Sequence, residues 1–508
     1  MQRKSVVVIG AGLGGVSAAI SLAQEGYAVT LLEKNGHVGG KLNQLQAEGF
    51  TFDLGPSILT LPHIFERLFE RSGKRMADYV SIRPVRPHWR CLFEDQTVVD
   101  MTPDEAEMTA QLHKIGEAPE DFERFRQYSE GLYDLVNEGY FEQGLDNATE
   151  FRKFYGLWKF TQFDVFRNMQ QGVARFIKTR YMRDILEQFI KYVGSSALRA
   201  PAFMNCLPAI HFRHDLWYVD GGLYNLARAL HRLLDEVGVT LKLDTEVEKI
   251  VTANGRATEV KLKGGDRMAA DIIVCNMEVV PAYERLLGED AGFLRKLKRF
   301  EPSCSGLVID LGLDRQYPQL AHHNFFMSGD QPKHFHTVFQ KRELPTDPTV
   351  YVVAASRTDP TVVPAGGDSL KILPHIPHID DDNPLRREDY LALKDLILDK
   401  LERMGLTDLR RHIVFEHVLT PHDIRDMYYS NKGSIYGVVT DRWTNFGFKA
   451  PKQSERYENL FFVGGSVNPG GGMPMVVLCG QNVSRAVVEY DRGVATSNVR
   501  VGAEVPQA

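Results

Sequence analysis

The stretch that decides the fold is Ser5-Val-Val-Val-Ile-Gly-Ala-Gly-Leu-Gly-Gly-Val-Ser-Ala-Ala-Ile20. Its β-branched run from Val6 to Ile9 predicts a buried parallel strand, and the alanine-rich segment behind the glycines predicts a helix that ends near Gln24. The turn between them needs glycine for a tight bend, for contact of the backbone with a pyrophosphate, and for close packing of the helix on the strand. The glycines of this G-x-G-x-x-G pattern are Gly10, Gly12 and Gly15.

A second strand and an acidic residue extend this pattern into a nucleotide site. Residues 28–32 predict a strand, and Glu33 follows it about 20 residues past Gly10, where a carboxylate accepts hydrogen bonds from ribose hydroxyls. The helix N-terminus around Leu13 and Gly14 offers N–H groups and the positive end of the helix dipole to phosphate. We therefore expect an adenine dinucleotide here; a glycine-rich turn without a ligand is the alternative.

Two further segments indicate which dinucleotide this is. Lys34 is followed by Gly39-Gly40-Lys41, where adjacent glycines allow a second close approach of the backbone to the ligand. This addition favours FAD over NAD, because a nicotinamide site needs no such extension. Residues 50–57 predict a strand that runs into a turn, which either joins the site or is a plain strand and turn. The turn residues expected to contact the cofactor are Gly55, Pro56 and Ser57.

The last glycine-rich segment, residues 459–474, repeats the strand–loop–helix form of the first. Its helix N-terminus predicts a contact with the flavin and its ribityl chain, and a strand–turn–helix that only closes the sheet is the alternative. In the middle of the chain, Val247 lies in a predicted strand that either approaches the adenine or belongs to the core. The cofactor-binding residues expected in these two segments are Val247, Gly464, Gly465, Ser466, Gly472 and Met473.

Composition limits the remaining choices. At 508 residues the chain is too long for one compact core, and its formal charge of -6 argues against a nucleic-acid partner. The five cysteines form no C-x-x-C pair, so we expect reduced, mostly buried thiols, no disulfide and no metal site. The first strand begins almost at the N-terminus, which leaves no room for a secretory signal, and no apolar run reaches the ~18 residues of a membrane-spanning helix.

Residues 151–200 differ in charge from the rest of the chain. Basic residues far outnumber acidic ones there, and aromatic residues lie between them. Basic groups with aromatic rings suit a helix that rests on anionic lipid headgroups, so the segment predicts contact with a membrane surface. The alternative is an ordinary helical insertion with its rings in the core. The aromatic residues concerned are Phe151, Phe154, Tyr155, Trp158, Phe160, Phe163, Phe166 and Phe176.

Nucleotide-type motifs at both ends and in the middle imply a cofactor domain that is discontinuous in sequence. We expect an α/β, Rossmann-like FAD-binding domain formed by residues 1–110, 218–290 and 424–508. An α+β substrate domain, which carries the helical membrane-contact segment, is then inserted twice, as residues 111–217 and 291–423.

With these motifs in this order, the sequence resembles the bacterial phytoene desaturase type of carotenoid oxidoreductase, within the flavin amine oxidase-like group. The resemblance covers nearly the full chain and implies the FAD-binding fold of p-hydroxybenzoate hydroxylase and the amine oxidases. One departure is Asn468, where relatives commonly carry His, and it bears on the substrate or the redox outcome rather than on the fold. The resemblance rests on residues 8–15, 33–34, 39–41, 52–57, 218–222, 322–324, 433–437 and 462–474.

The resemblance implies an FAD-dependent desaturase that removes hydrogens from an acyclic polyene of the phytoene or 4,4'-diapophytoene type in carotenoid biosynthesis. Hydride is then expected to pass from an allylic carbon to flavin N5, and quinone or oxygen to reoxidise the flavin. A hydrocarbon offers no polar handle, so a narrow apolar channel must position it. His211 and His322 are candidates for proton handling.

Three other functions fit the same fold. A carotenoid or diapocarotenoid oxygenase converts a terminal methyl group to an aldehyde and consumes oxygen. A polyene reductase, similar to retinol saturase, runs the hydrogen transfer in the opposite direction, and a flavin-bearing carrier stores a polyene without turnover. In each case we expect a cytoplasmic protein that associates peripherally with the membrane, because the ligand dissolves only in lipid.

Overall fold

The β-branched run near the N-terminus is the central strand of a parallel sheet. The computed structural model describes residues 3–493, apart from the side chains of Leu157, Trp158 and Phe160. The sheet has the order β20 (Leu460–Phe462), β13 (Ile272–Cys275), β1 (Ser5–Ile9), β2 (Ala28–Leu32) and β9 (Thr240–Lys242). All four pairings are parallel, so strands from both ends and the middle of the chain share one sheet.

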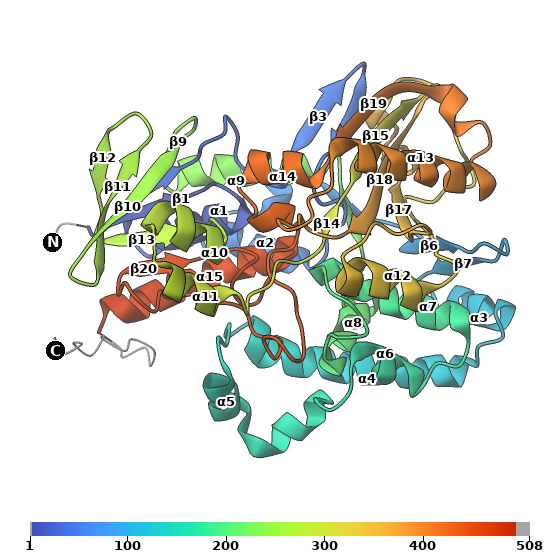
Figure 1. Ribbon diagram of the computed structural model, residues 1–508, viewed down its shortest axis with the longest axis horizontal. Helices are drawn as coiled ribbons and strands as arrows, with labels where there is room; N and C mark the ends of the chain where they lie inside the picture. Colours follow the sequence, from blue (N-terminus) through green and yellow to red (C-terminus); the bar gives the residue numbers. More distant parts are fainter. Residues whose placement is uncertain (1–2, 494–508) are drawn as a thin grey trace.

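Three helices pack around this sheet, which lies on the left of Figure 1. They are α1 (Leu13–Gln24), α9 (Tyr224–Glu236) and α15 (Met473–Asp491), and α1 contacts both of the others. The hydroxyl of Ser17 donates to the carbonyl of Val477 (2.6 Å), and a Cβ at Gly480 would lie only 2.6 Å from the Cβ of Ser17. The helices that follow the first and last glycine motifs are therefore in direct contact. Beside them lies an antiparallel sheet of β10 (Val247–Ala253), β11 (Arg256–Leu262) and β12 (Arg267–Ala269).

Helix α1 can start directly against β1 because Gly15 has no side chain. A Cβ at this position would overlap the carbonyl oxygen of Gly10. The N-cap residue is Gly12, which makes no side-chain hydrogen bond to the helix, so no cap blocks the N–H groups of the first turn. Gly15 thus serves the helix packing that its place in the motif predicts, and the first turn stays open to a ligand.

A second, larger sheet forms the upper right of Figure 1. Only the pairing of β16 with β6 is parallel; the other pairings are antiparallel. Helix α13 (Arg387–Arg403) packs on it through Leu393, Ile397 and Leu401, which join the strands in a separate apolar core. The strand order is β19 (Ile413–Leu419), β15 (Val308–Leu313), β18 (Asp368–Ile376), β17 (Val350–Val353), β16 (His323–Phe326), β6 (Trp89–Leu92) and β7 (Val98–Met101), with β14 (Ser305–Gly306) paired to β18.

The position of β6 and β7 differs from the expected domain organisation. Both strands fall within residues 1–110, which we assigned to the cofactor domain, yet β6 pairs with β16 of the large sheet. Strand β16 lies more than two hundred residues after β6 in the chain, so no local sequence pattern predicts that the two strands pair. The remaining domain boundaries stay predictions.

A group of helices fills the lower part of Figure 1, from α5 (Ala148–Phe160) near the centre to α3 (Glu105–Lys114) at the right. Its other helices are α4 (Pro119–Val136), α6 (Met169–Ala174), α7 (Arg180–Gln188) and α8 (Leu207–His214). Within residues 3–493, no helix is both long and apolar enough to cross a bilayer. The other elements are β3 (Gln44–Ala47), β4 (Phe50–Asp53), α2 (Pro62–Glu70), β5 (Ile82–Pro84), β8 (Trp217–Val219), α10 (Val279–Pro281), α11 (Ala291–Leu297), α12 (Gln331–His336) and α14 (Pro421–Tyr428).

The packing of α1 on β1 can be tested by adding one methyl group. Gly15→Ala is expected to lower the melting temperature, because overpacking of this kind costs about 1–3 kcal/mol. Gly131→Ala in α4 is the control, since nothing lies within 4 Å of its Cβ position and alanine favours a helix. Scanning fluorimetry of both variants measures the difference. Equal melting temperatures for Gly15→Ala and the wild type would contradict the close packing.

Candidate active site

The glycine-bearing turns touch one another through their backbones. A Cβ at Gly40 would lie 2.9 Å from the Cα of Gly12, and the N–H of Gly39 donates to the carbonyl of Ala11 (2.8 Å). The turn after β1 and the turn after β2 are therefore packed at van der Waals contact. Only glycine fits at this contact, because Gly40 also has a positive φ of 59°.

The first turn also meets the C-terminal strand. A Cβ at Gly14 would lie 3.2 Å from the Cα of Gly464 and 2.9 Å from the side-chain amide of Asn276. The Asn276 amide bridges the two segments, with its oxygen accepting from Gly12 N (3.2 Å) and its nitrogen donating to Val463 O (3.3 Å). Sequence reasoning missed Asn276, although it directly follows β13 at the edge of the sheet where ligands bind.

A third contact joins the C-terminal loop to residues 433–437. A Cβ at Gly437 would overlap the backbone of Gly465, and one at Gly471 would overlap the carbonyl of Tyr436. The loop before α15 is thus wedged between the first turn and the segment that carries Tyr436. Four glycine-containing segments, far apart in sequence, enclose one space.

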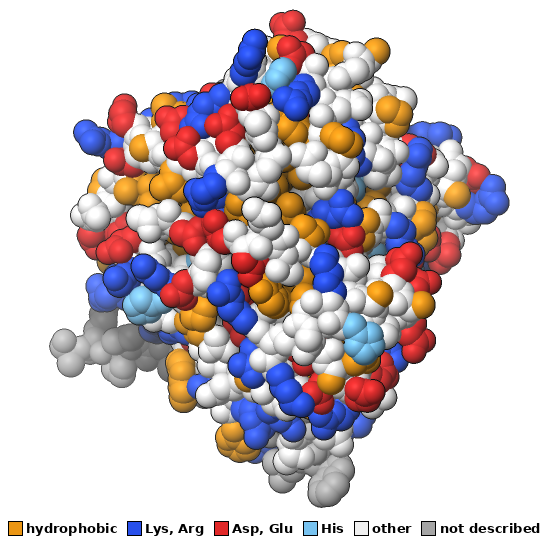
Figure 2. Space-filling view, turned by 90° about the vertical axis from the view of Figure 1, so that its right-hand side faces the viewer, with side chains coloured by type: hydrophobic (Ala, Val, Ile, Leu, Met, Phe, Trp, Pro, Cys, Tyr) orange, Lys and Arg blue, Asp and Glu red, His pale blue; other side chains and the backbone are white. Residues whose placement is uncertain are grey.

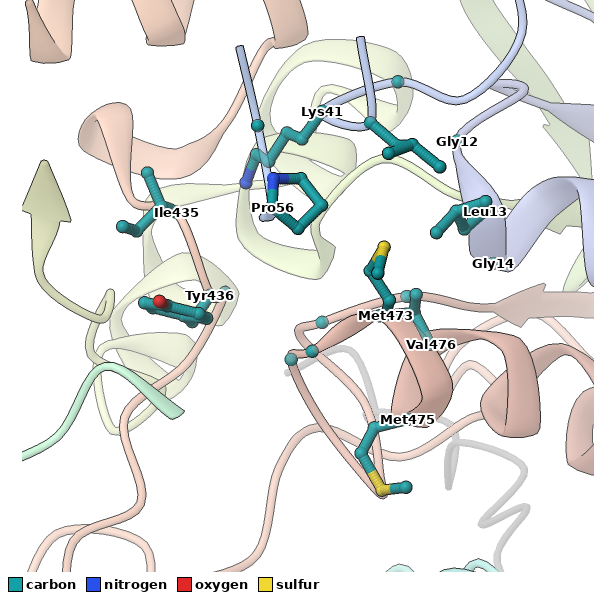
Figure 3. A pocket seen from close by; sticks show the side chains of 18 of the residues that line it. Gly12, Leu13, Gly14, Lys41, Pro56, Ile435, Tyr436, Met473, Met475 and Val476 are labelled. Carbon is teal, nitrogen blue, oxygen red and sulfur yellow. The ribbon is translucent and has the colours of Figure 1, made fainter. Parts of the chain in front are cut away.

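That space is a cavity of about 420 Å³, within the range of small-molecule sites. In Figure 3, Lys41 and Pro56 face it from one side, Ile435 and Tyr436 from a second, and Met473 lies beside the turn that carries Leu13. The sequence-predicted residues that line it are Gly10, Gly12, Leu13, Gly14, Glu33, Lys34, Gly40, Lys41, Gly55, Pro56, Ser57, Val247, Gly464, Gly465, Gly472, Met473 and His211.

Three candidates do not line this cavity. Gly15 packs behind the turn, as described above, and the Ser466 hydroxyl accepts from the N–H of Val279 (3.0 Å) in the core. His322 faces a separate small cavity and its Nδ1 lies 2.7 Å from the hydroxyl of Thr358. Burial lowers the pKa of His322 to about 3, so this ring is neutral, and it does not line the main cavity. The geometry gives His322 no part in the site.

The carboxylate of Glu33 is buried and fixed by backbone hydrogen bonds. Its side chain is 5% exposed, and its two oxygens accept from the N–H groups of Ala11 (2.7 Å) and Asn35 (2.9 Å). Each carboxylate oxygen has a second lone pair for a further donor. The carboxylate at the end of β2 thus points to the turn after β1, where a ribose next to a bound pyrophosphate would lie.

The turn at residues 55–57 is fixed by a lysine that sequence reasoning missed. Lys371, on β18 of the large sheet, donates from Nζ to the carbonyl of Gly55 and to the hydroxyl of Ser57 (3.0 Å). Burial lowers the pKa of Lys371 to about 8 and raises that of nearby Asp53 to about 6. Asp53 in turn accepts from two N–H groups at the start of α9 (2.9 and 3.2 Å). The two sheets are therefore joined at the cavity wall.

Beyond the glycine turns the wall becomes apolar and aromatic. His211 lies here, 2.9 Å from the hydroxyl of Tyr192 through its Nε2, and burial lowers its pKa well below the usual value. The neutral ring packs edge-on against Trp89 at 5.0 Å between centroids. Other residues of this part of the wall are Tyr140, Phe141, Phe203, Met204, Leu207, Ile210, Phe325, Tyr351 and Leu373.

Two buried lysines complete the wall, and neither was expected from the sequence. Lys191 lies 2.9 Å from His334 Nε2, and Lys449 donates to the carbonyl of Val438 and the hydroxyl of Thr440 (2.9 Å). Burial lowers the pKa of each lysine to about 7. In the part of the chain that the structure describes, no group of three His, Cys, Asp or Glu side chains is placed to hold a metal ion.

Comparison with known proteins assigns the chain to a family. The profile of the family "Flavin containing amine oxidoreductase" matches residues 13–488. A protein of Methylomonas sp named 4,4'-diapolycopene oxygenase is 57% identical over 96% of this chain and 98% of its own. The 4,4'-diaponeurosporene oxygenase of Staphylococcus haemolyticus is 47% identical over 98% of this chain and 100% of its own.

Solved structures share the fold at much lower identity. Putrescine oxidase bound to putrescine has a TM-score of 0.64 and 14% identity, and covers 96% of this chain and 99% of its own. A fatty acid isomerase of P. acnes has a TM-score of 0.60 and 15% identity, and covers 96% of this chain and 98% of its own.

The carboxylate of Glu33 can be tested by an isosteric change. Glu33→Gln puts an NH₂ group against a backbone N–H and removes an acceptor for ribose, so we expect at least about tenfold weaker dinucleotide binding. Glu248→Gln, at an exposed position on β10, is the control and should bind normally. The dinucleotide released on heating the purified proteins, measured by its absorbance, gives the occupancy. Unchanged occupancy in Glu33→Gln would rule out the ribose contact.

Proposed function

The chain belongs to the flavin-containing amine oxidoreductase family, and on that premise we propose that it is an FAD-dependent oxygenase that converts a terminal methyl group of an acyclic C30 polyene to an aldehyde. The observation that carries the proposal is one continuous cavity with glycine turns at one end and an apolar, aromatic wall at the other. The name of the relative at 57% identity, 4,4'-diapolycopene oxygenase, supports oxygenation of a polyene end over desaturation.

The residues of the cavity fit FAD. The uncapped first turn of α1 leaves its N–H groups open to the pyrophosphate, and glycine at position 12 is needed because a Cβ there would lie 2.6 Å from Asn276. Glu33 would accept from the ribose, and the turn at residues 55–57 and the loop before Met473 would hold the flavin. FAD, when bound, supplies two-electron chemistry with carbon substrates and with dioxygen.

The rest of the wall suits a long hydrocarbon. Its aromatic and aliphatic side chains exclude water and align a rod-shaped ligand without polar contacts. The overall reaction is balanced without an added reductant, since a methyl group and one O₂ give an aldehyde and one water. The neutral His211, with the hydroxyl of Tyr192, is the proposed group for proton handling within the wall.

Desaturation is the second candidate, because the sequence resembles the phytoene desaturase type in motifs along nearly the whole chain. It uses the same cavity and removes two hydrogens from the polyene, which requires quinone or oxygen as acceptor. The departure at Asn468, in the loop before α15, bears on which of the two reactions the site performs. Reduction of the polyene and storage without turnover remain the outcomes that the experiment below distinguishes.

We also propose that the protein docks on a membrane surface, but through fewer aromatic residues than expected. Tyr155 and Phe163 are buried in the main core, and Phe151 and Phe176 pack against it. The exposed rings are Phe154 (41%), Phe166 (87%), Trp443 (67%) and Phe446 (71%).

These exposed rings lie near the cavity and near basic groups. Arg442 donates to the carbonyl of Phe166 (2.8 Å), which joins the loop at residues 441–447 to the helical group. Phe203, which lines the cavity, lies 3.0 Å from the Cβ position of Gly447 in the same loop. Lys and Arg side chains gather at the lower end of Figure 2, where α5 lies in Figure 1. A lipid-soluble substrate can therefore pass from the bilayer to the cavity.

Labelled oxygen tests the proposed reaction. Liposome-bound holoenzyme, given an acyclic C30 polyene and ¹⁸O₂, should yield an aldehyde with one labelled oxygen per oxidised end. Immediate reduction with borohydride prevents exchange of the carbonyl oxygen before mass spectrometry. Loss of two hydrogens without label, with quinone as acceptor, would identify a desaturase. A gain of two hydrogens would identify a reductase, and an unchanged polyene a carrier.

The membrane proposal predicts the behaviour of the exposed loop. The double variant Trp443→Ser, Phe446→Ser should partition about tenfold less onto vesicles of phosphatidylglycerol and phosphatidylcholine, because it loses buried apolar area. Val414→Ser removes a 55% exposed side chain on β19 and should bind like the wild type. Co-sedimentation with the vesicles measures both. If all three proteins sediment equally, the loop is not the membrane contact.

A further inference from the structure

Lys449 is a buried lysine on the wall of an apolar cavity. Its side chain is 3% exposed, and it lines the cavity together with Thr440. Of the three N–H donors of its protonated form, one is accepted by the carbonyl of Val438 and one by the hydroxyl of Thr440 (2.9 Å). Among the described residues, no third acceptor and no carboxylate pairs with its Nζ. One donor on the cavity wall is therefore left over.

A spare donor of this kind needs an explanation. Burying a charged group without a counter-charge is costly, and burial lowers the pKa of Lys449 to about 7. A hydrocarbon ligand has no acceptor to repay that cost, so a purely apolar side chain would serve a hydrocarbon better. An oxygen atom on the ligand supplies the missing acceptor.

Asn468, where the sequence departs from the family that it resembles, fixes the position of Lys449. Asn468 accepts from the backbone N–H of Lys449 (3.1 Å) and from the hydroxyl of Tyr140 (2.8 Å), and it donates to the carbonyl of Leu145 (2.6 Å). It is fully buried at the start of the glycine loop before α15. A Cβ at Gly470 in this loop would lie 3.0 Å from Lys449 Cε, so the lysine is packed directly against the loop.

The second buried lysine of the wall, Lys191, differs from Lys449 in the direction of its head group. Lys191 also lies in the wall, but its Nζ contacts His334 (2.9 Å) and lies 5.3 Å from the ring centroid of Phe335. Neither of these partners lines the cavity, so the head group of Lys191 is directed behind the wall. Lys449 instead hydrogen-bonds to Thr440, which does line it.

We infer that Lys449, placed by Asn468 and oriented by Thr440, is the hydrogen-bond donor for an oxygen atom on the end of an oxidised polyene. The cavity then binds an oxygen-bearing polyene more tightly than the parent hydrocarbon. This inference rests on the proposed function and names the residue that recognises its product. Lys449 is here a binding residue, and Asn468 and Thr440 are positioning residues.

Binding without turnover tests the inference. Holoenzyme is titrated without oxygen with an acyclic C30 polyene aldehyde and, separately, with a C30 hydrocarbon that has the same number of conjugated double bonds. We expect the wild type to bind the aldehyde about tenfold or more tightly than the hydrocarbon, with a red shift of the aldehyde absorption, since a donor of this kind contributes on that order. Lys449→Met should lose the preference and the red shift and keep its affinity for the hydrocarbon. Lys296→Met, at an exposed position on α11 outside the cavity, is the control and should keep both.

Each other outcome has a defined meaning. A Lys449→Met protein that prefers the aldehyde as the wild type does, or that binds both ligands equally more weakly, overturns the inference. Should Lys449→Met not fold, Thr440→Val decides instead, and an undiminished preference in that variant also overturns it. The binding experiment needs no turnover, so its result holds even if the labelling experiment shows no incorporation of oxygen. Bleaching of the flavin by the hydrocarbon without oxygen would contradict the oxygenase and not the donor role of Lys449.

Discussion

Contact between glycine backbones is the constraint on which the rest of the structure depends. Gly12 against Gly40, Gly14 against Gly464, and Gly465 against Gly437 bring four distant segments to van der Waals contact. Side chains at these positions would overlap the neighbouring backbone and push the segments apart. The same absence of side chains leaves N–H groups facing the cavity, so close packing and ligand binding have one cause.

The two sheets contribute different residues to the cavity that these glycine turns enclose. The parallel sheet presents its carboxyl edge, with Glu33 and Asn276, to the dinucleotide, which is the usual place for a ligand in such a sheet. The large sheet contributes Lys371, which holds the turn at residues 55–57, and the aromatic rings of Phe325 and Tyr351. The change from glycine turns to an apolar wall within one cavity would allow the charged cofactor and the proposed hydrocarbon substrate to meet.

Much of the cofactor half could be predicted from the sequence, because its signals are local. The strand before Gly10, the spacing to Glu33 and the glycine pairs can each be recognised within a short stretch of sequence. The FAD cofactor and the family followed from them, and the comparisons confirm both. The pairing of β6 with β16 and the roles of Lys371, Lys449 and Asn276 escaped prediction, since they depend on segments that meet only in the fold. The exclusion of His322 from the cavity also depends on the fold, because its ring contacts Thr358 and Tyr218 from other segments of the chain.

The central claim is that the turns form a single site for both FAD and the polyene, and a crystal structure of the protein with both ligands tests it most directly. The account predicts the pyrophosphate on the N–H groups of Leu13 and Gly14, the flavin ring between Pro56 and Met473, and one end of the polyene beside that ring. Electron density for the polyene outside the cavity, or for a pyrophosphate away from the first turn, would contradict it.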